Sequence, residues 1–361
     1  MAAGDRRSFL KLMGAGASVA ASRCAPEDPG AETFVDQVER LEYEYIVVGS
    51  GAGGGPLAAN LARNGHSVLL LEAGKDTGSL LNYQVPAFHP LSTEDPAMRW
   101  DYFVKHYSDA AQQRRDSKLT SQGVLYPRAG TLGGCTAHNA MITVYPHASD
   151  WDGIASLTGD ASWSAARMRR YFELMERCEY LTSRDDTRGH GFRGWLRTRL
   201  SDATLAITDA KLLKIITASS IAFDLASLHD GDPIFLRSQL LQLLERDLNN
   251  VDPRRDTTEG LYMVPSAISG PRRSGPREFI LETIAGGARL RLETSALASR
   301  VLFDGRDKAG RLKAVGVEYL VGDKLYRAAP ARPPRRRWCA RRRGTRARWS
   351  SRAGPSTPRS S

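Results

Sequence analysis

Three glycines near the start of the chain have the G-x-G-x-x-G spacing of a dinucleotide-binding turn: Gly49, Gly51 and Gly54. They follow the apolar run 46–48, and Glu72 comes at the end of a second apolar run, 68–71. In this pattern the first glycine allows a tight turn, the second lets a pyrophosphate approach the backbone, and the third lets the next helix pack closely. An acid about 20 residues after these glycines accepts hydrogen bonds from an adenosine ribose. Residues 43–74 are therefore predicted to form a strand–turn–helix–strand unit that binds a dinucleotide.

A second glycine-rich segment, YPRAGTLGGCTAHNAMITVY, occupies residues 126–145. Together with 43–74 it resembles the glucose-methanol-choline (GMC) family of FAD-dependent alcohol oxidoreductases, in which a P-R-G-x-x-L-G-G-x-S-x-x-N-x-M segment wraps the pyrophosphate and the flavin ring. The chain departs from the family at Ala129, where glycine is usual, and at Cys135 and Thr136, which replace two serines. The resemblance implies FAD as the cofactor. It also implies cofactor contacts from Gly49, Gly51, Gly54, Glu72, Ala73, Gly130, Gly133, Gly134, His138, Asn139, Ala140, Met141 and Ala298.

His138 has a special place in the resemblance. Some family members carry a histidine at this position and link a ring nitrogen covalently to the flavin, which makes the flavin a better hydride acceptor. A histidine that only packs against the flavin is the alternative, and the sequence leaves both open. At Ala298 the resemblance implies a backbone contact with the adenine.

The resemblance implies an α/β fold, in which a Rossmann-like FAD-binding domain carries an inserted or adjacent α+β substrate domain and is incomplete at its C-terminus. The FAD-binding domain would be formed by 40–150 and 257–326, and the substrate domain by 151–256. Within the substrate domain, residues 189–196 resemble an H-G-x-x-G-x-L turn of the family. His190 in that turn is expected to be structural. The segments 211–223 and 235–248 have the pattern of two amphipathic helices.

The N-terminus has the pattern of an export signal. Residues 5–22 place two arginines before a stretch of small, mildly apolar residues, as in a bacterial twin-arginine signal. That stretch is too short and too rich in Gly and Ala to span a bilayer. We expect 1–30 to be a signal or a disordered segment, with a periplasmic or exported protein if the signal is used and a cytoplasmic one if it is not.

The formal net charge of +11 is concentrated in the tail. Residues 327–361 hold twelve arginines and no Lys, Asp or Glu, so that residues 1–326 carry a net charge of −1. The body of the protein is therefore not the basic surface that nucleic-acid binding requires. The four cysteines form no C-x-x-C pair, and neither a zinc site nor a disulfide framework is indicated.

The tail itself, 327–361, is rich in Arg and Pro and is expected to be disordered. A shift of the reading frame in the gene would explain this unusual composition. With suitable synonymous codons for 347–361, the shifted reading frame encodes EVVLAGGPFNTPQL, which resembles the strand and flavin loop that come next in the family. We therefore expect a frameshift after about residue 327, which resequencing of the locus would test.

These observations predict oxidation of an alcohol by hydride transfer to the flavin. The substrate would be a polyol, a sugar, a choline-like compound or another alcohol, and the electron acceptor a quinone or a cytochrome. The family's catalytic base is a histidine near the true C-terminus, so no catalytic residue is named in this chain and the truncated form is expected to be inactive. The alternative is a non-catalytic nucleotide-binding protein whose basic tail binds nucleic acid. No transmembrane span and no metal site are expected.

Overall fold

The computed structural model describes residues 42–181, 189–200, 208–224, 247–257, 262–307, 309–330 and 341–346. The predicted export signal, all but the last two residues of the second amphipathic helix at 235–248 and most of the arginine-rich tail lie outside these ranges. Within the described ranges, no helix combines the length and the apolar character needed to cross a bilayer.

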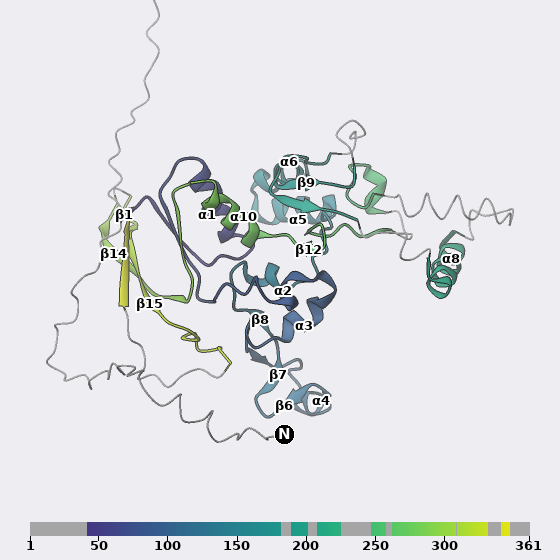
Figure 1. Ribbon diagram of the computed structural model, residues 1–361, viewed down its shortest axis with the longest axis horizontal. Coiled ribbons are helices and arrows are strands. Elements are labelled where there is room, and N and C mark those ends of the chain that lie inside the picture. Colours follow the sequence, from purple (N-terminus) through teal and green to yellow (C-terminus); the bar gives the residue numbers. More distant parts are fainter. Residues whose placement is uncertain are drawn as a thin grey trace, which may run out of the picture. The chain divides into compact units, whose positions relative to one another are not determined.

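A parallel sheet runs in the order β13-β3-β2. The helices α1 (Gly54–Arg63) and α10 (Pro276–Ala285), which pack against each other, lie next to it (Figure 1). Strand β2 spans Tyr45–Val48, β3 spans Val68–Leu71 and β13 spans Leu290–Glu293. All four residues of β3 are buried, as expected for a central parallel strand that is covered on both faces. Helices α1 and α10 contribute to the core on one side of the sheet.

The side chains of β3 alternate between two apolar cores, because successive residues of a strand point to opposite faces. Val68 and Leu70 pack with α1 and α10 in a core completed by Val47, Ala58, Ala62, Leu132, Ile280 and Leu290. Leu69 and Leu71 pack instead with Tyr43, Ala296, Val317 and Tyr319. The second core belongs to a four-stranded sheet in the order β1-β16-β15-β14. This layered arrangement agrees with the predicted α/β fold.

In the second sheet, β14 (Ala296–Arg306) and β15 (Leu312–Val321) form a long antiparallel pair. Strand β16 (Arg341–Arg346) pairs antiparallel with β15 and parallel with β1 (Glu42–Tyr43). This strand differs from the prediction that all of 327–361 is disordered. The reason is tertiary: the edge of β15 offers unpaired backbone groups, which can hold a segment of poor strand composition in a ladder.

Short elements connect the layers. Between β3 and the second glycine segment lie α2 (Leu81–Gln84), η1 (Pro86–Phe88), α3 (His89–Glu94), β4 (Arg99–Trp100), β5 (Phe103–Val104), α4 (Ala110–Arg114), β6 (Leu119–Thr120) and β7 (Gly123–Leu125). The second glycine segment contains β8 (Arg128–Ala129) and η2 (Gly134–Ala137). The chain then forms α5 (Ala148–Thr158), η3 (Ala161–Trp163), α6 (Ala165–Met175), β9 (Glu176–Cys178), β10 (Leu196–Thr198), α8 (Ala210–Asp224) and η4 (Pro253–Asp256). The substrate domain expected at 151–256 stays a prediction. A hairpin of β11 (Ile268–Ser269) and β12 (Arg272–Arg273) leads into α10.

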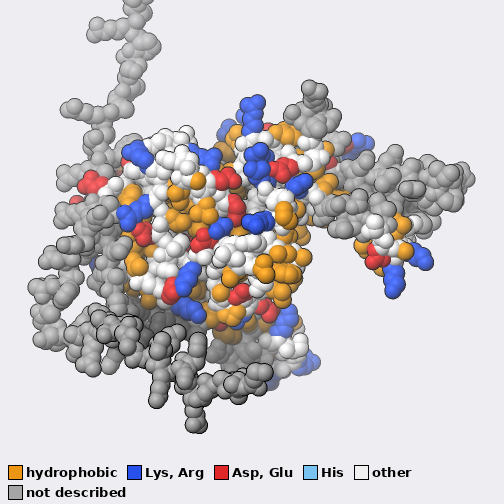
Figure 2. All heavy atoms as spheres, viewed as in Figure 1, with side chains coloured by type: hydrophobic (Ala, Val, Ile, Leu, Met, Phe, Trp, Pro, Cys, Tyr) orange, Lys and Arg blue, Asp and Glu red, His pale blue; other side chains and the backbone are white. Residues whose placement is uncertain are grey.

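Charged side chains of both signs are interspersed on the face shown in Figure 2, with hydrophobic side chains between them. On this face the described residues form no extended patch of a single sign. The pattern agrees with the near-neutral charge of residues 1–326.

Candidate functional site

The two predicted glycine segments meet in the fold. A Cβ atom added to Gly134 would lie 2.7 Å from the Cα atom of Gly51, and Gly134 itself has a φ of +58°, which favours glycine. Next to this contact, the N–H of Gly133 donates a hydrogen bond of 3.0 Å to Oγ of Ser50, which is 83 residues away in the sequence. The fold therefore brings together two segments that sequence analysis could only assign to the same site by resemblance.

Ser50 also connects the turn to Glu72. Its N–H and its hydroxyl donate to Oε2 of Glu72 at 3.0 and 2.5 Å, and the N–H of Gly74 donates to Oε1 at 2.8 Å. Ser50 is completely buried and Glu72 is 7% exposed. Thus Glu72, which was predicted to bind a ribose, holds the glycine turn against β3 through its own carboxylate. The ribose contact stays a prediction, and the role of Ser50 was missed. Its only sequence signal is a small hydroxyl residue between the first two glycines.

The glycines of the turn differ in what they do for the protein itself. A Cβ on Gly54 would lie 2.0 Å from the carbonyl oxygen of Gly49, so this glycine is needed for helix α1 to pack against the strand. A Cβ on Gly51 would meet nothing nearer than the Cα of Gly134 at 3.8 Å, which is an ordinary contact. At Gly53 it would meet nothing within 4 Å. The turn just before α1 therefore presents open backbone at Gly51 and Gly53, at the end where a helix binds phosphate, and the chain's own residues fit a dinucleotide there.

His138 lies just after η2 and is 7% exposed. Its Nδ1 atom is buried and has no hydrogen-bond partner among the described residues. Burial, followed by the positive charges of Arg273 and Arg128, lowers the pKa of His138 to about 4. The imidazole is therefore uncharged at neutral pH. A buried nitrogen without a partner is what a site built for a further group would contain.

The residues after His138 form a tightly held loop. Oδ1 of Asn139 accepts hydrogen bonds from the N–H of Met141 at 3.2 Å and from Nη1 of Arg273 at 2.8 Å. Met141 is buried and has a φ of +60°, a conformation that costs energy for a residue with a side chain. Ala140 between them is half-buried. The predicted residues 138–141 thus share one loop, and its contact with Arg273 could not be read from the sequence.

The other predicted site residues lie around Glu72. Ala73 and Gly130 line a pocket of about 310 Å³, together with Trp100, Ser295 and Lys324. Gly130 has no room for a side chain, because an added Cβ would lie 2.6 Å from the indole ring of Trp100. Ala298 is on β14, whose first residue, Ala296, donates a backbone hydrogen bond of 2.8 Å to the carbonyl oxygen of Glu72. The contact of Ala298 with adenine stays a prediction.

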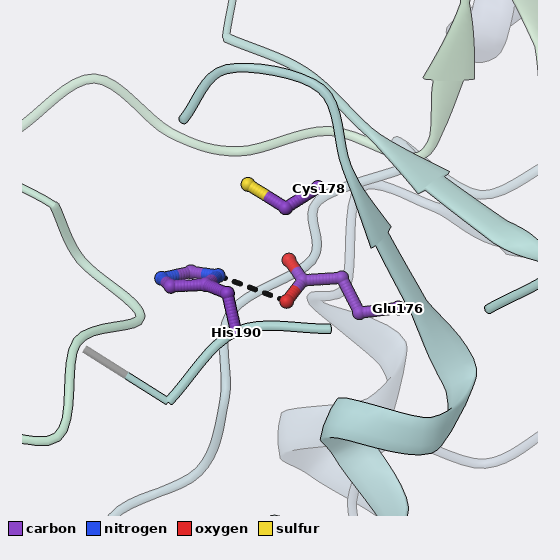
Figure 3. A group of neighbouring side chains, drawn as sticks. All are labelled: Glu176, Cys178 and His190. Atoms are coloured by element: carbon purple, nitrogen blue, oxygen red, sulfur yellow. Dashed lines mark hydrogen bonds and ion pairs between the residues drawn. The ribbon is translucent and has the colours of Figure 1, made fainter. Parts of the chain in front are cut away.

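A second buried polar group surrounds His190, and Figure 3 shows its ring beside Glu176 and Cys178. Nδ1 of His190 lies 2.8 Å from Oε2 of Glu176, and Nε2 lies 2.8 Å from Oδ2 of Asp247. All three side chains are buried. Burial by itself would lower the pKa of His190, but hydrogen bonds with Asp247, Cys178 and Glu176 outweigh it and raise the pKa to about 11. His190 is therefore a buried imidazolium between two carboxylates, which agrees with the structural role expected for it.

The same group contains atoms of the kinds that bind transition metals. The ligand atoms of Glu176, Cys178 and His190 all lie within 4.8 Å of one another. However, a carboxylate occupies each imidazole nitrogen, and Oε1 of Glu176 already accepts a hydrogen bond of 2.8 Å from Thr198. We therefore interpret the group as an ion triad that joins β9, the 189–191 turn and the segment that begins at Asp247.

A family model described as GMC oxidoreductase matches residues 43–331, which is most of the chain. The chain belongs to the GMC oxidoreductase family. The matched range contains both glycine segments, the His190 turn and the β14–β15 pair. GMC oxidoreductases bind FAD, so the predicted family, fold and cofactor are confirmed.

The curated relatives include an alcohol dehydrogenase [acceptor] of Pseudomonas putida, which is 28% identical over 280 residues, covering 77% of this chain and 42% of that protein. An oxygen-dependent choline dehydrogenase of Pseudomonas syringae pv. syringae is 26% identical over 290 residues, covering 78% of this chain and 42% of that protein. The dehydrogenase eriK of Hericium erinaceus is 33% identical over 131 residues, covering 36% of this chain and 20% of that protein. The chain thus spans less than half the length of these relatives.

Solved structures support the fold. Pyridoxine 4-oxidase from Mesorbium loti matches with a TM-score of 0.57 and 19% identity, over 84% of this chain and 48% of that one. A formate oxidase matches with a TM-score of 0.56 and 15% identity, over 78% of this chain and 42% of that one. At these identities the matches show a shared fold and carry no information about substrate.

Proposed function

We propose that this chain forms the FAD-binding part of an oxidoreductase that oxidises an alcohol. The observation that supports the proposal best is the contact between Gly51 and Gly134, with Ser50 joining both segments to Glu72. Packing of the protein alone does not require glycine at position 51, whereas a pyrophosphate close to the backbone does.

When bound, FAD would supply the chemistry of the reaction, by accepting a hydride from the alcohol carbon. The chain's own residues bind and orient it. The open turn before α1 and the backbone of Gly133 and Gly134 would hold the pyrophosphate, with Glu72 and Ala73 at the ribose. Residues 138–141 would lie along the flavin. Nδ1 of His138, which has no partner among the described residues, would be available for contact or for covalent attachment.

The substrate class is proposed from the relatives. Alcohol and choline dehydrogenases are among them, so a primary alcohol or a choline-like compound is the first class to assay. No described residue is assigned as the catalytic base. We also propose export through the twin-arginine-type segment and electron transfer to a quinone or cytochrome. The alternative of a nucleic-acid-binding protein rests on the basic tail, most of which lies outside the described residues.

Flavin binding is the experiment that tests the proposal. The purified chain is titrated with FAD and, as the matched control, with NAD, and the heat of binding measured by titration calorimetry reports either complex. We expect a saturable FAD complex and no NAD complex. A folded protein that binds neither would refute the proposal. Precipitation with trichloroacetic acid then separates the two states of His138: flavin that remains in the pellet is covalent, and flavin in the supernatant is not.

A further inference from the structure

Arg273 is a buried charged residue that the proposed function does not explain. It is the second residue of β12, and 2% of it is exposed. Its Nη1 atom donates to the carbonyl oxygen of Thr136 at 3.1 Å, and to both the carbonyl oxygen and Oδ1 of Asn139 at 2.8 Å. Its Nε atom donates to the carbonyl oxygen of Tyr83 at 3.2 Å. Its Nη2 atom is buried and has no hydrogen-bond partner among the described residues. Burying a guanidinium is costly unless its donors are used, so this arrangement needs a reason.

Two of the residues that accept hydrogen bonds from Arg273 flank His138 in the sequence. They are Thr136 and Asn139, so one guanidinium holds the chain on both sides of the histidine. The opposite end of the guanidinium rests on the segment around Tyr83, because Nε donates to the Tyr83 carbonyl oxygen and the Arg273 side chain lies over the Tyr83 ring, 5.8 Å from its centroid. Arg273 therefore fixes the loop against another part of the chain.

The positive charge of Arg273 also acts on the imidazole of His138. The charged groups that act on His138 are Arg273 on β12 and Arg128 on β8, and both disfavour a protonated ring. Burial acts in the same direction and is the largest cause. The result is an uncharged imidazole whose Nδ1 atom has no partner in the described part of the chain.

We propose that Arg273 is a positioning residue of the cofactor site, which fixes the loop carrying His138 and places a positive charge beside its imidazole. The inference rests on the proposed FAD site. A guanidinium suits both tasks, because its fork reaches several acceptors and its charge persists at every physiological pH.

Two variants separate the tasks. Arg273→Lys keeps the charge, but its single amine cannot reach acceptors on Tyr83, Thr136 and Asn139 together. Arg273→Met removes the charge and the hydrogen bonds together. Arg272→Met is the matched control, because Arg272 is the neighbouring residue of β12 and is exposed. We expect FAD affinity to fall by about tenfold or more in both Arg273 variants, since hydrogen bonds to charged groups are lost. The control should bind FAD as the wild type does.

The second readout is the titration of the His138 ring, followed by NMR of histidine-labelled protein without FAD and assigned with His138→Gln. The wild-type and Arg273→Lys rings should not titrate between about pH 5 and 8. In Arg273→Met the inflection should rise from about 4 towards the ordinary value of about 6.5, without reaching it because burial remains. A merely structural role would not move this inflection.

The outcomes are distinct. Wild-type FAD affinity in Arg273→Lys would overturn the positioning role, and this variant decides it even if Arg273→Met does not fold. An unchanged His138 inflection in a folded Arg273→Met would overturn the role of the charge. If wild-type protein fails to bind FAD, the proposed function fails, whereas the titration without FAD still judges the effect of Arg273 on His138.

Discussion

Replacing two glycines of the same turn by alanine should have opposite consequences. In Gly54→Ala the new Cβ would lie 2.0 Å from the carbonyl oxygen of Gly49, so the backbone must move and we expect a loss of about 1–3 kcal/mol in the free energy of unfolding. In Gly51→Ala the nearest atom is 3.8 Å away. Its φ is not in the left-handed region, so we expect a change within about 0.5 kcal/mol. FAD affinity should show the reverse order. The methyl group added in Gly51→Ala would lie where the pyrophosphate approaches the backbone, so we expect FAD binding to weaken about tenfold or more.

The assay combines urea unfolding with FAD titration on each variant. Gly153→Ala in α5 is the matched control, because its Cβ also points into open space. It should leave the FAD affinity unchanged and raise the free energy of unfolding by about 0.5–1 kcal/mol, because alanine favours a helix interior over glycine. If Gly51→Ala bound FAD as tightly as the wild type, the open backbone at α1 would not be the pyrophosphate site. If Gly51→Ala were as unstable as Gly54→Ala, the distinction between a packing glycine and a binding glycine would be wrong.

Three further predictions concern the buried hydrogen-bond groups. Ser50→Ala should lower stability by about 1–3 kcal/mol in urea unfolding, because Oε2 of Glu72 and the N–H of Gly133 both lose a buried partner, whereas wild-type stability would contradict the link. Glu176→Gln should cost about 3–5 kcal/mol by the same measurement, since it leaves the His190 imidazolium short of a charge partner; a cost below that of Ser50→Ala would count against the triad. The folded pKa of His190, about 11, is above its unfolded value of about 6.5. Its contribution to stability is therefore fully present below about pH 6.5 and is lost as the pH rises towards 11. Glu176→Gln should flatten the fall in the free energy of unfolding above neutral pH. Parallel curves of stability against pH for the variant and the wild type would contradict this.

Much of the nucleotide-binding unit is predictable because its signals are local. The predicted strand at 68–71 coincides with β3, and the run 46–48 lies inside β2. A continuous apolar run can only be buried on both faces, and the glycines limit the turn that follows it, so position along the chain determines the structure here.

The partners of polar side chains were not predictable, because they come from distant segments. Nothing near Ser50 in the sequence indicates that it accepts a hydrogen bond from Gly133, and nothing near Arg273 indicates a bond to Asn139, 134 residues away. His190 illustrates the limit well. A turn pattern suggested a structural role, but the two carboxylates that make it an imidazolium are 14 and 57 residues away.

The connections of Glu72 explain why the fold and the cofactor site depend on each other. Its carboxylate accepts from Ser50 and Gly74, and Ser50 in turn accepts from Gly133, so three segments converge on one buried acid. The backbone that faces the dinucleotide is thus held by the protein's own hydrogen bonds, and FAD does not have to order it. Binding then avoids part of the entropy cost of fixing loops. A change at Ser50 should therefore weaken FAD binding, because the turn would no longer be held in place. Ser50 itself is buried beneath the turn and is not one of the residues predicted to contact the cofactor.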